Sequence, residues 1–98
     1  MFSLESKVAL ITGGARGIGR AIARGLAQAG AAVMITDVDS GPLTEAQAEI
    51  GRIARRCAQL PGDITDASFP AELVNRTIQD LGGLDIIVNN AGYTWDNV

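Results

Sequence analysis

The chain has 98 residues, 47% of them hydrophobic and 4% aromatic, with a formal net charge of −3, which fits one close-packed α/β domain and excludes a disordered chain. The acidic balance and the lack of a long apolar stretch exclude nucleic acid and membranes as expected partners. A single cysteine, Cys57, and no histidine exclude an intrachain disulfide and most metal clusters, so we expect a cytoplasmic protein.

The first predicted element is a strand over residues 8–11, a continuous apolar run typical of a strand buried on both faces of a parallel sheet. Glycines follow at positions 13, 17 and 19, and a helical pattern begins at Ile18. A strand that runs through glycines into a helix aims backbone N–H groups and the positive helix end at one spot, which suits a phosphate or pyrophosphate. The alternative is that these glycines serve only as tight turns.

The helix after the glycines is expected to end at Gly30 in a left-handed conformation. Its inner face is predicted from apolar residues at helical spacing, namely Ile18, Ile22, Leu26 and Ala29. Residues 32–37 then predict a second buried strand. A right-handed crossover makes these two strands parallel neighbours.

The rest of the chain repeats this alternation of strands and helices. Gly41-Pro42 is expected to open a second helix with Ala46, Ile50, Ile53 and Ala54 on its inner face, and residues 57–60 predict a short third strand. Thr65 or Asp66 is expected to cap a third helix, and residues 84–88 predict a fourth strand. The inner face of the third helix is predicted at Phe69, Leu73, Thr77 and Leu81.

The order βαβαβαβ predicts one α/β domain over residues 1–98 with a doubly wound, Rossmann-type parallel sheet. The usual topology places the strands in the order 3-2-1-4, with a ligand crevice between strands 1 and 4. The glycine-rich loop after strand 1 and the polar segment after strand 4 should therefore meet at one site.

The second strand ends in Asp37, whose carboxylate can accept hydrogen bonds from both hydroxyls of an adenosine ribose. The same charge would repel a 2′-phosphate, so Asp37 favours NAD over NADP. The alternative is an exposed turn aspartate beside Asp39. Arg16 favours NADP, because a cation in the glycine-rich loop can pair with a 2′-phosphate, unless it is merely a solvated loop residue. We expect NAD, with NADP as the alternative.

Two further segments follow predicted strands. Asp63 can accept a hydrogen bond from an adenine amino group while Ile64 covers the ring; the alternative is that Asp63 only begins the capping turn of the next helix. Asn89-Asn90-Ala91-Gly92 ends the fourth strand, where small residues let the backbone pass close to a cofactor ribose. The two amides can also bond to neighbouring strand ends.

With these segments in this order, the chain resembles the N-terminal, cofactor-binding half of a short-chain dehydrogenase/reductase. The matching motifs are Thr12-Gly13-x-x-x-Gly17-x-Gly19, Asp37, Asp63-Ile64-Thr65-Asp66 and Asn89-Asn90-Ala91-Gly92, and residues 93–98 further resemble 3-oxoacyl-acyl-carrier-protein reductases. The resemblance implies that the backbone at Gly13, Ala15, Arg16, Gly17, Ile18 and Gly19 holds the pyrophosphate and that Asp37 holds the adenosine ribose. It also implies that Asp63 and Ile64 hold the adenine, and Asn90, Ala91 and Gly92 the neighbouring ribose.

The resemblance further implies hydride transfer between a nicotinamide cofactor and a small carbonyl or alcohol, in an enzyme that is a homo-oligomer. Family members use a Tyr-x-x-x-Lys pair, but the only tyrosine here is Tyr93 and the only lysine is Lys7. We therefore assign no catalytic residue and no metal ligand, and expect the cofactor-binding portion of a longer enzyme, inactive alone. A non-catalytic dinucleotide-binding module is the alternative, and a different Rossmann enzyme such as a methyltransferase fits less well.

Overall fold

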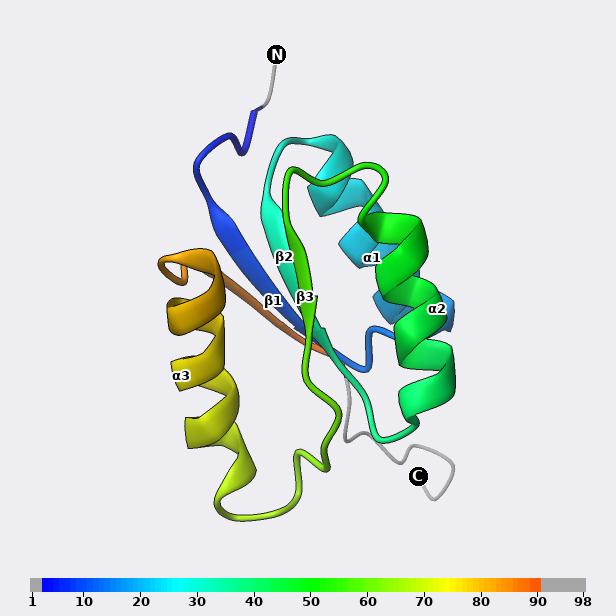
Figure 1. Cartoon of the computed structure of the whole chain (residues 1–98), viewed down its shortest axis with the longest axis vertical. Helices are drawn as coiled ribbons and strands as arrows, with labels where there is room; N and C mark the ends of the chain where they lie inside the picture. Colours follow the sequence, from blue (N-terminus) through cyan, green and yellow to red (C-terminus); the bar gives the residue numbers. More distant parts are fainter. Residues whose placement is uncertain (1–2, 91–98) are drawn as a thin grey trace.

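The computed structural model describes residues 3–90, which form a parallel sheet with helices on both faces (Figure 1). The elements are β1 (Val8–Thr12), α1 (Gly17–Gln28), β2 (Ala32–Thr36), α2 (Ser40–Ile50), β3 (Cys57–Gln59), α3 (Phe69–Leu81) and β4 (Ile86–Asn89). The strands lie in the order β3-β2-β1-β4 and all pair in parallel. This confirms the predicted βαβαβαβ order and strand order 3-2-1-4.

Alternating residues of the two central strands supply a core on each face of the sheet. Helices α1 and α2 cover the face that carries Ala9, Ile11, Val33 and Ile35. Helix α3 covers the face that carries Val8, Leu10, Ala32 and Met34. Because both faces are covered, every residue of β1 and β2 is buried, which explains why the sequence shows continuous apolar runs there.

Helix α1 buries a different face from the predicted one. Ile18 is 72% exposed, and the helix instead buries its small residues Gly19, Ala23 and Ala27. Small side chains let the helix backbone lie close to the sheet, so the bulky Ile22 and Leu26 pack along the margin of the core and are half-buried. The predicted inner face was therefore correct in part: Ile22, Leu26 and Ala29 pack against the core, whereas Ile18 does not.

The helix ends follow the glycines. Gly30 has φ +110° after α1 and Gly82 has φ +86° after α3, which confirms the left-handed end predicted for α1. Helix α2 ends at Ile50 with Gly51 as its C-cap, so Ile53, predicted inside this helix, lies beyond it and is 38% exposed.

The third helix was predicted correctly on its inner face and wrongly at its cap. Phe69, Leu73, Thr77 and Leu81 are all buried. The N-cap residue is Ser68, whereas Asp66 lies earlier and its Oδ1 accepts hydrogen bonds from the Ser68 amide and hydroxyl. Asp66 therefore stabilises a separate turn that precedes the helix and does not cap the helix itself.

The segment after β3 continues along the end of β2 and so reaches the same edge of the sheet. The Leu60 amide donates to the Ile35 carbonyl at 3.1 Å, and the Gly62 amide donates to the Asp37 carbonyl at 3.0 Å. A side chain at position 62 has no room, because an added Cβ would overlap the buried ring of Phe69.

We expect Gly62→Ala to lower the free energy of unfolding by about 2 kcal/mol, because the ring of Phe69 is fixed in the core and must shift. Urea unfolding measures this change. Gly83→Ala is the matched control, since an added Cβ there meets nothing within 4 Å. Equal losses in the two variants would contradict the packing argument.

Candidate functional site

The glycine-rich loop joins β1 to α1 and bends over the end of β2. Gly13 has φ +67° and Gly17 has φ +61°, a backbone region that side chains disfavour. The amide of Gly14 donates to the Thr36 carbonyl at 3.0 Å, and an added Cβ at Gly14 would lie 2.9 Å from the Ile35 side chain. The loop is therefore held tightly against the end of the neighbouring strand.

Gly19 closes the first turn of α1 onto this loop. An added Cβ at Gly19 would overlap the Gly13 carbonyl and lie 2.8 Å from Nδ2 of Asn90. Only a glycine therefore fits at this position. The first N–H groups of a helix have no partner within the helix, and those of α1 begin beside this loop. This arrangement of a glycine-rich loop and a helix N-terminus suits a phosphate or pyrophosphate.

Side chains at the end of β4 bind the loop to the sheet. The Thr12 hydroxyl donates to Oδ1 of Asn89 at 3.0 Å and accepts from the Asn90 amide at 2.9 Å. Nδ2 of Asn90 donates to the Gly13 carbonyl at 3.4 Å. The predicted meeting of strands 1 and 4 at one site is thus present, and both amide residues bond to the neighbouring strand end. Ala91 and Gly92 lie outside the described residues.

Asp37 lies directly after β2 and faces the glycine-rich loop. Its Oδ2 accepts a hydrogen bond from the Ala15 amide at 3.1 Å, and its Oδ1 accepts one from the Val38 amide at 2.8 Å. A carboxylate has about four acceptor positions, so these two bonds leave capacity for ribose hydroxyls. The side chain is half-buried at the carboxyl edge of the sheet, where the sequence predicted it.

The cation of the loop faces a second acid. Nη2 of Arg16 lies 3.7 Å from Oδ2 of Asp39, and these side chains are 66% and 52% exposed. Asp39 is the N-cap residue of α2, but its side chain makes no capping hydrogen bond. An exposed ion pair of this kind contributes little to the free energy of folding. It nevertheless places a negative charge beside the Arg16 guanidinium, the group that would bind a 2′-phosphate.

Asp63 and Ile64 lie in the loop between β3 and α3. Oδ1 of Asp63 accepts hydrogen bonds from the Thr65 hydroxyl at 2.6 Å and the Thr65 amide at 2.9 Å. These bonds lower the pKa of Asp63 and match the alternative in which it begins a turn. Ile64 lines an apolar cavity of about 260 Å³ that Thr12 and Asn89 also line.

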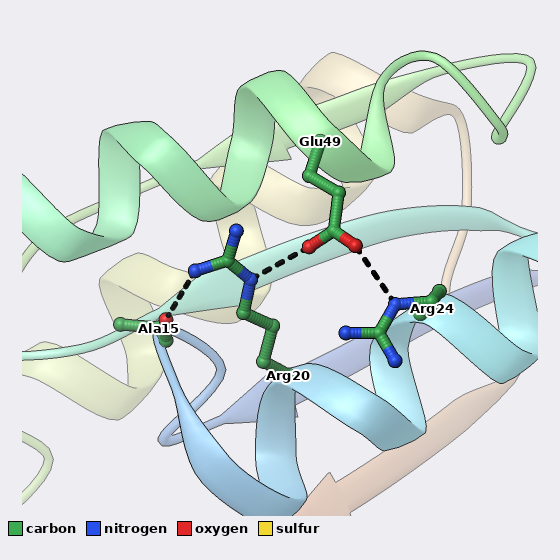
Figure 2. Close-up of polar contacts among 4 residues, drawn as sticks. All are labelled: Ala15, Arg20, Arg24 and Glu49. Carbon is green, nitrogen blue, oxygen red and sulfur yellow. Dashed lines mark hydrogen bonds and ion pairs between the residues drawn. The ribbon is translucent and has the colours of Figure 1, made fainter.

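A charged cluster beside the loop was not predicted from the sequence. Glu49 of α2 accepts hydrogen bonds from Nε of Arg20 at 2.7 Å and from Nε of Arg24 at 2.9 Å, both on α1 (Figure 2). These two arginines hold the pKa of Glu49 below its ordinary value. The charges are visible in the sequence, but the partners lie on different helices, and no local spacing rule pairs them.

We expect Glu49→Gln to flatten the loss of stability in acid. The Glu49 pKa is lower in the folded chain than in the unfolded chain, so its contribution is complete above the unfolded pKa and disappears as pH falls through the folded pKa. Urea unfolding between about pH 6 and about pH 3 should show a larger loss in the wild type than in the variant. Equal losses would contradict an ion-pair origin.

Within residues 3–90, no helix is long and apolar enough to cross a membrane. The same residues contain no group of three or more cysteine, aspartate or glutamate side chains that could hold a metal ion. Cys57 lies in β3, and burial raises the pKa of its thiol to about 11. The thiol is therefore protonated near neutral pH, which does not suit a nucleophile.

Known proteins are similar to this chain in sequence and in fold. Residues 7–98 match the family model described as short chain dehydrogenase. An uncharacterized oxidoreductase of Mycobacterium tuberculosis is 42% identical over 97 residues, which cover 99% of this chain and 37% of that protein. The chain therefore spans only part of the length of the relatives that it matches.

Solved structures agree with the sequence matches. A dehydrogenase/reductase from Sinorhizobium meliloti superposes with a TM-score of 0.87 at 43% identity, covering 92% of this chain and 36% of that one. Carveol dehydrogenase from Mycobacterium avium, solved in complex with NAD, superposes with a TM-score of 0.86 at 30% identity, covering 100% of this chain and 42% of that one.

Proposed function

Since the chain belongs to the short-chain dehydrogenase family, we propose that residues 1–98 form the dinucleotide-binding domain of an NAD(P)-dependent oxidoreductase. The observation that carries the proposal is the meeting of three strand ends. Hydrogen bonds join the glycine-rich loop after β1 to Asp37 after β2 and to Asn90 after β4. Ligands of parallel α/β sheets bind at such a carboxyl edge, where the strand order reverses.

Each part of a dinucleotide has a candidate partner at this edge. Asp37 would accept from the adenosine ribose hydroxyls, Asp63 and Ile64 would contact the adenine, and Asn90 would lie near the second ribose. The position of Ile64 on the wall of the apolar cavity supports a contact with a flat ring. The residues proposed for the pyrophosphate are Gly13, Ala15, Arg16, Gly17, Ile18 and Gly19, and Ala91 and Gly92 are proposed beside Asn90.

We favour NAD over NADP as the cofactor. Asp37 and Asp39 place two carboxylates where a 2′-phosphate would lie, and Arg16 faces one of them. The negative charges would repel the phosphate, while the Arg16 cation would attract it. The NAD complex of carveol dehydrogenase supports this preference by analogy.

The cofactor would supply the hydride, exchanged with a small carbonyl or alcohol. The residues described here would bind and orient the dinucleotide, and we assign none of them to proton transfer. The Tyr-x-x-x-Lys pair implied by the family resemblance is absent from residues 1–98, so we propose that this chain supplies the cofactor-binding half only. We also propose homo-oligomeric assembly, from the same resemblance, and a cytoplasmic location, from the single cysteine.

Titration of the full-length protein with NADH and with NADPH tests the function. We expect saturable binding of both dinucleotides, with NADH bound about tenfold more tightly because of the two carboxylates. Tighter binding of NADPH would contradict the NAD preference. Absence of binding to either would contradict the function itself, and binding without turnover of any carbonyl or alcohol would favour the non-catalytic module.

A further inference from the structure

The Glu49 carboxylate joins two arginines that are closely matched. Arg20 and Arg24 lie one helical turn apart on α1, and each donates one Nε hydrogen bond to Glu49 (Figure 2). Their side chains are 26% and 39% exposed. Both therefore tie α1 to α2 through the same acceptor, with the same charge.

The two arginines differ in their distance from the glycine-rich loop. Nη1 of Arg20 donates to the Ala15 carbonyl at 3.5 Å, whereas Arg24 lies one turn further along the helix. Ala15 is fully buried, and its own amide donates to Oδ2 of Asp37 at 3.1 Å. Ala15 is thus held from both sides, by a cation at its carbonyl and by a carboxylate at its amide.

The contact of Arg20 with the Ala15 carbonyl also orients the peptide that joins Ala15 to Arg16. In a planar trans peptide the carbonyl and the following N–H point in opposite directions. When Arg20 holds the Ala15 carbonyl, the N–H of Arg16 is therefore directed away from Arg20. The orientation of the loop at Arg16 thus depends on a side chain of α1 that Glu49 of α2 keeps in place.

We propose that Arg20, anchored by Glu49, is a positioning residue for the dinucleotide pyrophosphate. It acts through the Ala15 carbonyl, which sets the direction of the loop N–H at Arg16 before the ligand arrives. This inference rests on the proposed function, because it assumes that the loop amides meet a pyrophosphate. It also gives helix α2 a role in the site, because Glu49 of α2 holds Arg20 in place although it contacts no part of the proposed ligand site itself.

The matched variants Arg20→Gln and Arg24→Gln separate positioning from charge and from stability. Each removes one positive charge and one hydrogen bond to Glu49, and Arg20→Gln alone also removes the long bond to the Ala15 carbonyl, so losses in the melting temperature of similar size are expected. In the full-length protein, Arg20→Gln should raise the Kd for NADH by about tenfold, because the peptide that carries the Arg16 N–H loses the charged donor that orients it. Arg24→Gln should change it by less than about twofold.

Glu49→Gln gives a second test with an opposite electrostatic expectation. It leaves both arginines unneutralised near the loop, so charge alone predicts tighter binding of the anionic dinucleotide. Positioning predicts weaker binding, because a glutamine amide has no charge and one acceptor oxygen for two arginines, so Arg20 is held less firmly. Arg20→Lys, which keeps the charge and one donor group, should bind NADH with an intermediate Kd and serves if Arg20→Gln does not fold.

Equal Kd values for Arg20→Gln and Arg24→Gln, or tighter binding by Glu49→Gln, would overturn the inference. The wild-type titration separates this failure from failure of the proposed function. If the wild type binds no dinucleotide, the function is wrong. If the wild type binds and the matched variants do not differ, only the positioning role is wrong.

Discussion

Gly19→Ala is expected to abolish dinucleotide binding and to lower the free energy of unfolding by about 3 kcal/mol. The added Cβ would overlap the backbone carbonyl of Gly13 and approach Nδ2 of Asn90 to 2.8 Å. The loop cannot move aside easily, because Gly14 and Ala15 are hydrogen-bonded to the end of β2 and to Asp37. Urea unfolding and NADH titration measure the two losses.

Gly25→Ala provides the control for this prediction in the same helix. An added Cβ at Gly25 meets nothing within 4 Å, and alanine is the better helix former. We expect Gly25→Ala to raise the free energy of unfolding by up to about 1 kcal/mol and to leave the Kd for NADH unchanged. A Gly19→Ala variant that behaves like Gly25→Ala would refute the close approach of loop and helix.

Asp37→Asn is expected to weaken NADH binding by roughly 10- to 100-fold. The variant keeps the shape of the side chain but loses the charge that strengthens its hydrogen bonds to ribose hydroxyls. NADPH should be affected less, since the variant also removes a carboxylate that repels the 2′-phosphate. The ratio of the two Kd values should therefore move toward NADPH, and fluorescence titration measures both.

Asp80→Asn is the control for the loss of a carboxylate. Asp80 lies in the last turn of α3, and its backbone carbonyl accepts a hydrogen bond from Arg56 just before β3. This places it at the amino edge of the sheet, away from the candidate site. We expect no change in either Kd, and an Asp37→Asn variant with an unchanged Kd ratio would count against Asp37 as a ribose ligand.

Much of the fold could be predicted because the central strands are buried on both faces. The structure contains the features that local sequence predicted: β1 and β2 are continuous apolar strands, and left-handed glycines follow α1 and α3. The inner face of α3 followed from residues spaced four positions apart, three of them apolar and one a threonine, on the helix that alone covers one face of the sheet. Apolar runs, glycines or helical spacing within one segment were sufficient in these cases, and no knowledge of distant contacts was needed.

The fully buried residues of α1 could not be predicted from hydrophobicity, because the close approach of the helix to the sheet selects small residues there. The larger residue Ile18 has more apolar surface to bury than Gly19, yet Gly19 faces the core. The reason is the short distance between α1, the Gly13 carbonyl and the Asn90 side chain. A helix that must approach a sheet this closely selects small residues, and this constraint is visible only in three dimensions.

The sequence predicted the strand ends that form the candidate site, but it did not predict the ion pairs beside the glycine-rich loop. Strand ends at Asp37 and Asn90 are read from local motifs, and topology brings them together. The contacts of Glu49 with Arg20 and Arg24 join residues on different helices, so the sequence offers the charges without their pairing. The turn at Asp63 is formed by neighbouring residues, and the sequence alone allowed two roles for Asp63, an adenine contact or the start of this turn.

A crystal structure of the full-length protein with bound NAD tests the central claim most directly. The account predicts the pyrophosphate at the backbone amides of Arg16, Gly17 and Ile18, since the Ala15 amide is bonded to Asp37, with the adenosine ribose hydroxyls within hydrogen-bonding distance of Asp37. Arg20 should still bond to the Ala15 carbonyl in that complex. A pyrophosphate bound away from the glycine-rich loop, or a ribose that makes no contact with Asp37, would contradict it.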